Sequence, residues 1–368
     1  QVTINVFKKM LSQVGDRQII VPLSAGNDSR LVVSVLSYLG AKNVKCYSYG
    51  SSNNFEANIA KKIAQKLKYE WIFLPLTHKG EKKFYKSTEY GCYLEFSETY
   101  SSVPYIQGLS TIKYLKEINW IDDDAVFING NSGDFISGAH ISGLAQDIDV
   151  GDIHNEMKES ILNKLIVKHF SLWSYLKTNQ NIERIRENLL DELLEVCGEI
   201  EDKSKEHLFY ECSEFLNRQS KYVITGQRSY EFYEHEWRLP LWDDEYLHFW
   251  QKVPAKYKAE QKLYIDMLKN NNFGNVWSDD IPVNKKTIKP VWIIPLRFLT
   301  KIPFSFFGRR GKKAWHQFEI VFFYYWMDNT RMMSTLPYWR VIKSFGENPQ
   351  NHVSWQAVDY IRDKLKLK

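Results

Sequence analysis

Long apolar segments are missing from this 368-residue sequence, and so is any leader with the features of a secretory signal. No run approaches the roughly 20 uncharged apolar residues that a helix needs to cross a bilayer. The N-terminus also lacks the basic, apolar and small-residue order of a signal peptide. These absences favour a soluble, cytoplasmic protein. Because the first residue is Gln1, we expect a processed product or a fragment, which leaves an upstream domain open.

Cysteine is scarce and its positions are scattered: Cys46, Cys92, Cys197 and Cys212. No two of them form a CxxC pair, and no histidine spacing completes a zinc site, so neither disulfides nor a structural metal are expected. Excess charge of one sign is small as well, with a formal net charge of +5. Nucleic-acid-binding proteins usually carry a stronger or more focused positive charge, so we expect no nucleic-acid partner.

The first half of the chain alternates apolar runs with amphipathic stretches. The predicted strands are residues 19–23, 44–49, 71–76 and 125–128, and the predicted helices are residues 4–14, 31–39 and 56–67. Strands separated by helices pair in parallel, with both sheet faces covered. The prediction is an α/β fold: a doubly wound parallel sheet over residues 1–150, followed by a mainly helical region over residues 151–368. Residues 182–201 and 206–223 are expected helices of that second region.

The turn after the first predicted strand reads Leu23-Ser24-Ala25-Gly26-Asn27-Asp28-Ser29-Arg30. Backbone N–H groups at a helix start carry partial positive charge, and small residues let phosphate oxygens approach them. The two serines can donate hydrogen bonds to the same phosphates, and Arg30 can add a full positive charge. Asp28 can hold a magnesium ion that accompanies a triphosphate. The GK[ST] ending of a Walker A loop is absent, and an ordinary helix N-cap explains the same residues without any ligand.

A second glycine-rich turn, Asn129-Gly130-Asn131-Ser132-Gly133-Asp134, follows the last predicted strand of this half. Ligands of doubly wound sheets bind beyond the carboxyl ends of the strands, so the two turns are expected to face one crevice. Asp28 and Asp134 could then share one metal ion. The alternative is a glycine-rich turn with a capping aspartate.

These turns, together with later segments, carry a family resemblance. Residues 23–30 resemble the SGGxDS pyrophosphate loop of N-type ATP pyrophosphatases. The series of motifs from about residue 3 to 290 resembles the synthetase domain of the asparagine synthetase family. The other matching segments are Tyr47-Ser48-Tyr49-Gly50 with residues 55–60, residues 130–134, Glu236-Trp237-Arg238-Leu239-Pro240-Leu241-Trp242-Asp243, and Ile281-Pro282-Val283-Asn284-Lys285-Lys286. The forms PLSxGxDSR and NGxSGD look most like the stand-alone amidotransferases of bacterial surface-polysaccharide clusters.

The resemblance implies an adenine nucleotide alpha hydrolase-like fold and a two-step reaction with ATP and Mg²⁺. A small-molecule carboxylate attacks the α-phosphorus of ATP, and an amine then attacks the acyl adenylate to form an amide. A sugar acid is the favoured carboxylate, and ammonia, free or from a separate glutaminase, is the expected amine. One rival is a cyclase whose amine belongs to the substrate itself. The other is a non-catalytic ATP-binding protein.

The resemblance also implies a role for each matching residue. Asp28 and Asp134 correspond to the magnesium-binding acids, and Lys285 or Lys286 corresponds to a lysine that contacts pyrophosphate. Together with Asn131, these lysines are the catalytic candidates. The candidate nucleotide-binding residues are Leu23, Ser24, Ala25, Gly26, Asn27, Asp28, Ser29, Arg30, Tyr49, Gly130, Ser132 and Gly133.

Three features depart from the family pattern. Ala25 stands where the family usually has glycine, and a left-handed conformation there would cost about 1–2 kcal/mol. Asn131 stands where a glutamate often serves to deprotonate the amine, and an amide cannot act as that base. A glutaminase domain is absent from the sequence, so ammonia would come from solution, from a separate subunit or from a missing upstream domain.

Two charged groups have structural explanations. Glu236, Arg238 and Asp243 are expected to form an internal, buried ion pair that fixes a helix to the first domain, with substrate contact as the alternative. Residues 285–313 contain many lysines, arginines and aromatic residues but no acid. Core aromatics beneath snorkelling basic side chains are the preferred interpretation, and weak contact with a membrane surface is the alternative.

Overall fold

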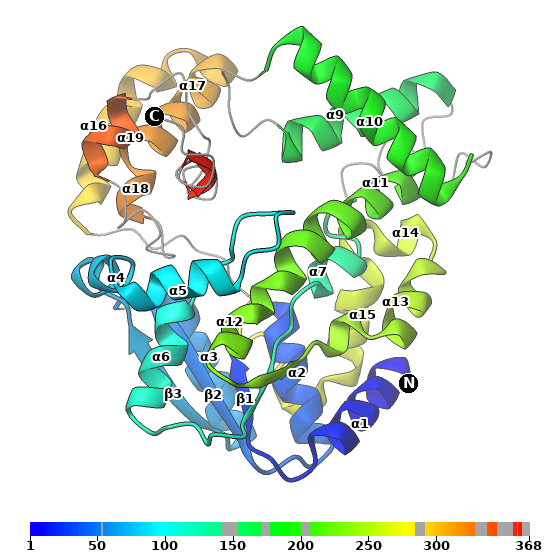
Figure 1. The fold of residues 1–368 in the computed structure, drawn as a ribbon, viewed down its shortest axis with the longest axis vertical. Coiled ribbons are helices and arrows are strands. Elements are labelled where there is room, and N and C mark those ends of the chain that lie inside the picture. Colours follow the sequence, from blue (N-terminus) through cyan, green and yellow to red (C-terminus); the bar gives the residue numbers. More distant parts are fainter. Residues whose placement is uncertain are drawn as a thin grey trace.

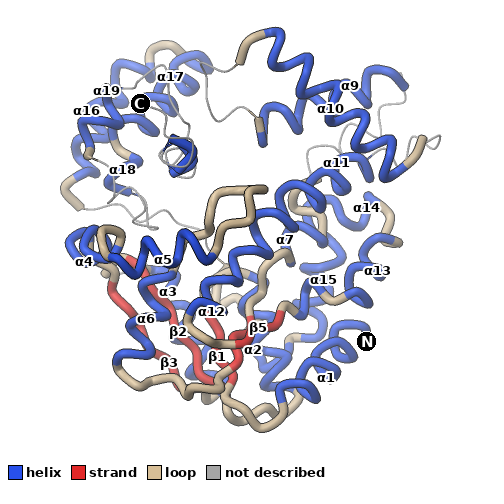
Figure 2. Tube along the Cα trace, viewed as in Figure 1, coloured by secondary structure: helices blue, strands red, loops and turns tan. Residues whose placement is uncertain are grey.

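A single parallel sheet forms the centre of the protein (Figure 2). The structure is a computed structural model that describes residues 1–52, 54–141, 154–170, 177–199, 207–283, 291–327, 337–343, 356–358 and 360–362. The sheet strands in the described residues are β1 (Ile19–Pro22), β2 (Val44–Gly50), β3 (Glu70–Pro75), β4 (Val126–Ile128) and β5 (Glu236–Arg238). Their order is β3-β2-β1-β4-β5, and every pairing is parallel. The predicted α/β fold with a parallel sheet is therefore confirmed.

Both faces of the sheet are buried, because alternate side chains of each strand enter different cores. Ile20 and Phe127 belong to one core, and Val21 and Ile128 belong to the other. The first core is covered by α4 (His78–Phe84), α5 (Thr88–Phe96), α6 (Leu109–Glu117) and α12 (Arg228–Phe232). The second is covered by α1 (Val2–Val14), α2 (Asn27–Tyr38), α3 (Phe55–Leu67), α13 (Asp244–Gln251) and α15 (Lys262–Asn271). This double cover explains why the central strands β1 and β4 are continuous apolar runs.

The chain leaves the central strand β1 in two directions. It first builds β2 and β3 on one side, and later β4 and β5 on the other. The carboxyl ends of β1 and β4 thus lie side by side where the strand order reverses, and short α7 (Gly133–Ile136) follows β4. Open α/β sheets bind their ligands in the crevice at this reversal.

The expected division at residue 150 differs from the packing. Strand β5 comes from the second half yet pairs with β4, and Ile128 lies opposite Arg238. Tyr246, Tyr264 and Ile281 belong to the same core as β1. A three-residue edge strand shows no periodicity that sequence analysis can detect, and residues 207–283 are needed to cover the sheet.

The remaining elements are helical, as predicted for the second region. A smaller core joins α9 (His154–His169), α10 (Asn179–Cys197) and α11 (His207–Ser213). Another lies among α16 (Ile293–Ser305), α17 (Gly308–Phe322) and α18 (Tyr324–Met327), near α19 (Tyr338–Lys343), at one edge of the molecule (Figure 1). Short helical segments are η4 (Thr225–Gln227), η5 (Pro240–Trp242), α14 (Ala255–Lys258), η6 (Ala259–Gln261) and η7 (Phe273–Asn275). No helix in the described residues is long and apolar enough to cross a membrane.

The expected helix over residues 206–223 is two elements. After α11 the chain continues as a π-helix, η3 (Glu214–Ile224). Long π-helical segments are rare and often lie at functional sites.

Candidate functional site

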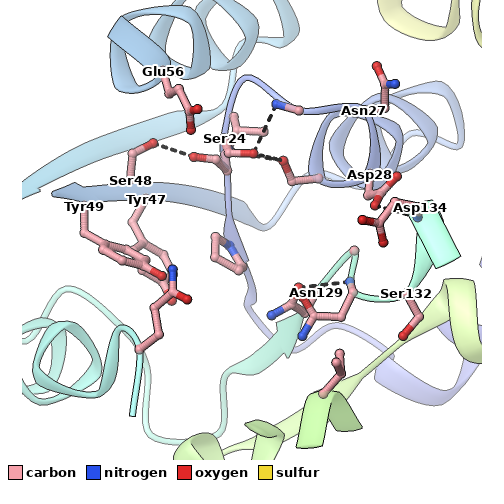
Figure 3. Close-up of a pocket in the computed structure, with 18 of the residues that line it drawn as sticks. Ser24, Asn27, Asp28, Tyr47, Ser48, Tyr49, Glu56, Asn129, Ser132 and Asp134 are labelled. Atoms are coloured by element: carbon pink, nitrogen blue, oxygen red, sulfur yellow. Dashed lines mark hydrogen bonds between the residues drawn. The ribbon is translucent and has the colours of Figure 1, made fainter. Parts of the chain in front are cut away.

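A pocket of about 680 Å³ opens at the carboxyl ends of β1, β2 and β4. Its wall comes from the turn after β1, the end of β2, the start of α3, the turn after β4 and the π-helix. In Figure 3, Asp28 and Asp134 lie next to each other, and Tyr47 and Tyr49 lie on the opposite side of the view. The predicted site residues that line it are Leu23, Ser24, Gly26, Asn27, Asp28, Ser29, Tyr49, Gly130, Asn131, Ser132 and Asp134.

Two serine hydroxyls shape the first turn. Ser24 Oγ lies 3.0 Å from Ser29 Oγ, and it accepts a hydrogen bond from the N–H of Gly26 at 3.1 Å. Helix α2 begins at Asn27 with Gly26 as its capping residue. A glycine has no side chain to occupy the first-turn amides, so the N-cap explanation of this turn does not hold in its usual form. The start of a 12-residue helix thus faces the pocket with its partial positive charge.

Arg30 does not face the pocket, which corrects the expectation that it would add charge there. Its guanidinium donates hydrogen bonds to four carbonyl oxygens, at 2.9 Å from that of Ala25 and at 2.8–3.2 Å from those of Val276, Ile281 and Pro282. The side chain is 1% exposed, and burial lowers its pKa to about 10. Residues two apart in a helix lie on different faces, so Asp28 and Arg30 point in different directions.

Ala25 carries no backbone strain. It is absent from the residues with positive φ, and its side chain is fully buried in the core and does not line the pocket. The expected cost of a left-handed alanine therefore does not arise. The Ala25 side chain belongs to the core and not to the pocket wall.

The two aspartates meet as the paired turns predict. Asp134 donates its backbone N–H to Asp28 Oδ2 at 3.0 Å, and the two side chains lie next to each other in Figure 3. The Tyr264 hydroxyl donates to Asp28 Oδ1 at 2.9 Å. Asp134 Oδ1 accepts from the N–H of Phe135 at 2.9 Å. The two carboxyl groups therefore come from the turns after two different strands and are held next to each other at one end of the pocket.

Glycines make this approach possible. A Cβ built on Gly133 would lie 2.5 Å from Asp28 Cγ, and one on Gly130 would lie 2.7 Å from the Asp28 carbonyl carbon. Gly133 does not line the pocket, so its part is to let Asp28 pack against the second turn. The glycines predicted to touch a nucleotide are required first by the contact between the two turns.

The aspartate pair fits a magnesium ion better than a metal held by protein alone. No group of three or more His, Cys, Asp or Glu side chains is arranged to hold a metal in the described part of the chain. Magnesium is commonly held by one or two carboxylates, with phosphate oxygens and water as its other ligands. Asp28 and Asp134 are such a pair.

Aromatic rings line the other end of the pocket. Tyr47 and Tyr49 stack with ring centroids 6.2 Å apart, and burial raises the pKa of both hydroxyls. A Cβ on Gly108 would lie 3.1 Å from the Tyr49 ring. The Leu23 carbonyl accepts a hydrogen bond from Ser48 Oγ at 2.6 Å. The Leu23 N–H donates a hydrogen bond to the Tyr47 carbonyl of the neighbouring strand. These contacts leave a flat apolar wall beside the β1 turn.

The π-helix adds residues that sequence reasoning missed: Arg218, Gln219, Tyr222 and Val223. Gln219 is 1% exposed, and its Oε1 accepts a hydrogen bond from Ser132 Oγ at 2.9 Å. Its Nε2 has no hydrogen-bond partner among the described residues. A buried amide donor without a partner is unfavourable, so this wall suits a ligand that supplies an acceptor. The amphipathic pattern of residues 206–223 is that of an ordinary helix, so it does not indicate that these residues line a pocket.

A buried charge cluster supports the π-helix at its first residue. Glu214 is fully buried and lies 3.0 Å from His140 Nδ1, 2.6 Å from His169 Nε2 and 2.5 Å from Lys168 Nζ. Burial alone would raise the pKa of Glu214, but hydrogen bonds from these three groups hold it well below its usual range. His140 Nε2 also lies 3.7 Å from Asp134 Oδ2. Burial opposes protonation of His140, yet its two acidic partners raise its pKa.

Lys285 and Lys286 are outside the described residues. Asn131 lines the pocket and donates its N–H to Asn129 Oδ1 at 3.1 Å.

The charges of residues 236–243 form ion pairs, as the structural explanation predicted, but these pairs lie at the surface and not in the interior. Glu236 lies 2.9 Å from Arg17, and Asp243 lies 2.9 Å from Lys9. None of these side chains lines the pocket, and the Glu236 carboxyl group is 54% exposed. These residues tie the later part of the chain to α1 and its following turn.

A search of family models finds no match for this chain, and a search of curated proteins finds no significant relative.

Proposed function

We propose that this protein binds ATP with Mg²⁺ in the pocket, activates a carboxylate as its adenylate and transfers the acyl group to an amine. The observation that supports this most is the contact of the turns after β1 and β4. It sets two carboxyl groups beside the glycine-capped start of α2. The adenine nucleotide alpha hydrolase-like fold belongs to the same proposal.

The pocket offers different chemistry along its length. Pyrophosphate would lie against Ser24, Ser29 and the first amides of α2, where donors meet the charge that builds up as the bond to the α-phosphorus breaks. Asp28 and Asp134 would hold the magnesium ion, which would neutralise part of that charge. The wall formed by Tyr47 and Tyr49 suits the flat adenine ring.

The π-helix is the proposed place of the acid to be activated. Arg218 supplies a cation to the pocket wall, and Gln219 supplies the unpartnered amide described above. A carboxylate oxygen held there would attack the α-phosphorus, and pyrophosphate would leave. An amine would then attack the acyl carbon, lose a proton and expel AMP. A sugar acid remains the proposed carboxylate, and Asn131 leaves proton removal to another group or to an amine that arrives neutral.

Exchange of labelled pyrophosphate into ATP tests the first half-reaction. Wild-type protein with Mg²⁺ and a panel of carboxylates, uronic acids among them, is expected to catalyse exchange with at least one acid. Asp28→Asn removes a charge from the metal pair and is expected to abolish exchange while the circular dichroism spectrum is retained. Asp122→Asn, at an exposed position outside the pocket, is the matched control and should exchange at the wild-type rate.

The rivals give distinct results. Binding of ATP without exchange for any acid would indicate a non-catalytic nucleotide-binding protein. Exchange that leads to AMP release without any added amine would indicate the cyclase. Full exchange by Asp28→Asn would rule out the proposed metal pair.

A further inference from the structure

Helices α16 and α17 form a hairpin, residues 291–322, and the outer face of α16 is apolar. On α16 the inward positions are Ile293, Arg297, Thr300 and Phe304, spaced as one helix face. The outward positions of a soluble helix should be polar. Here the outward large apolar side chains are Ile294, Leu296, Phe298, Leu299 and Ile302, which are 42–69% exposed.

The apolar surface continues over the tip of the hairpin. Phe306 and Phe307 are 80% and 70% exposed, and at the start of α16 Val291 and Trp292 are 82% and 53% exposed. Isolated exposed apolar residues are common on proteins, but contiguous patches of this kind mark interaction surfaces.

The hairpin is built as a defined unit. Gly311 packs against α16 so closely that a Cβ there would overlap the Phe304 carbonyl oxygen, and Gly308 at the tip has φ of +52°. Arg297 forms an ion pair with Glu319. The rings of Phe304, Trp315 and Phe318 pack between the two helices, with centroids 5.5–5.7 Å apart. The exposed rings are therefore presented by a packed scaffold.

The charged residues of the hairpin indicate which kind of partner this apolar surface can bind. The hairpin contains one acid, Glu319, which is paired with Arg297, and its basic residues are Arg297, Lys301, Arg309, Arg310, Lys312 and Lys313. The last five are exposed next to the apolar tip. Apolar rings surrounded by unopposed cations match a bilayer with anionic headgroups, where acyl chains and negative charge lie within a few ångströms of each other.

We infer that the α16–α17 hairpin docks this protein on an anionic phospholipid surface, with Phe306 and Phe307 inserted at the level of the headgroups. The hairpin lies on the bilayer and does not span it, since a helix of 13 residues is about 20 Å long, shorter than the ~30 Å hydrocarbon core. A second copy of the hairpin is a poor partner because two like-charged surfaces would meet. The inference does not depend on the chemistry of the pocket.

Co-sedimentation of the whole chain with vesicles tests this docking surface. Wild-type protein is expected to bind vesicles of phosphatidylcholine with about one third phosphatidylglycerol at low salt, and to bind pure phosphatidylcholine far less. Phe306→Ser with Phe307→Ser should lower the partition coefficient about tenfold or more. Arg309→Gln with Arg310→Gln should lower it about tenfold at low salt and less at high salt.

Two control variants remove similar groups elsewhere. Tyr100→Ser removes a ring that is 90% exposed, and Lys61→Gln with Lys62→Gln removes two exposed charges from α3. Both should bind vesicles like wild type. The inference is overturned if wild type stays in the supernatant with anionic vesicles, or if the phenylalanine variant binds equally well. It is also overturned if the hairpin variants dissociate a dimer and leave vesicle binding unchanged.

Discussion

Gly133 decides how closely the turn after β4 approaches the turn after β1. Its missing side chain lets the Asp28 carboxyl group lie against the second turn and next to Leu241, whose Cδ1 would be 2.7 Å from an added Cβ. Its backbone is not in the left-handed region, so space and not conformation requires glycine here.

Gly133→Ala is therefore expected to displace the Asp28 side chain without changing the backbone conformation at residue 133. Pyrophosphate exchange should fall about tenfold to a hundredfold, as for a catalytic group moved by about 1 Å. Overpacking should lower the free energy of unfolding by about 1–3 kcal/mol. Exchange kinetics and chemical denaturation measure the two effects. Gly91→Ala, in a helix with open space around it, is the control, and equal activity of both variants would contradict the role of Gly133.

Single residues show how far the sequence alone could lead. The pairing of Asp28 with Asp134 was predictable, because both follow neighbouring parallel strands at their carboxyl ends. The orientation of Arg30 was not predictable, because three of its four carbonyl partners lie about 250 residues away, at positions that no local pattern encodes. Tyr264, which holds Asp28, was missed for the same reason.

Among the elements, the π-helix depends most on buried charge. Glu214 opens it, and the cations around Glu214 come from α9 and from His140 after α7. An amphipathic sequence predicts a helix but not whether its hydrogen bonds follow the α or the π pattern. The π-helix therefore could not be predicted from residues 206–223. Three segments are joined at this carboxylate.

Glu214→Gln is expected to lower the free energy of unfolding by about 3–5 kcal/mol near neutral pH, because the basic groups around it lose their counter-ion. The depressed pKa of Glu214 gives stability that is present above the unfolded value of about 4.5 and lost as the pH falls. The raised pKa of His140 gives stability that is present below about 6.5 and lost as the pH rises. The free energy of unfolding of the wild type should therefore exceed that of the variant most between about pH 5 and 6.5.

Urea denaturation across the pH range measures that difference. Glu183→Gln removes an exposed carboxylate of α10, 3.8 Å from Arg186, and serves as the control. A stability difference that is the same at pH 3.5 and pH 6 would contradict the coupling of Glu214 to its cations.

At the scale of the molecule, the sheet and its covering helices come from distant parts of the chain. Alternating strands and helices were enough to predict the layers over residues 1–150. They were not enough to place β5 or α13 and α15, because an edge strand of three residues and helices that cover a remote sheet have no local signature. The helical cluster after residue 290 has a core of its own.

Truncated chains test which later segments the sheet requires and which it does not. A chain that ends at residue 200 lacks β5 and the residues that cover β1 and α2, so it is expected to aggregate or to lack a cooperative thermal transition. A chain that ends at residue 290 keeps them and should unfold cooperatively. Circular dichroism during heating measures both. A cooperative transition in the shorter chain would show that the later segments are not required for the sheet.

The hydrogen bond from Tyr264 to Asp28 spans 236 positions of the chain. Strands β4 and β5, which pair in the sheet, are separated by about 110 residues in the sequence. On a ribosome that adds roughly 5–20 residues each second, the first turn is made many seconds before its partner exists. During that interval the β4 edge is unpaired and the apolar side of α2 is uncovered. The nascent chain is thus most exposed to aggregation and most in need of chaperones just before the segment that completes the pocket emerges.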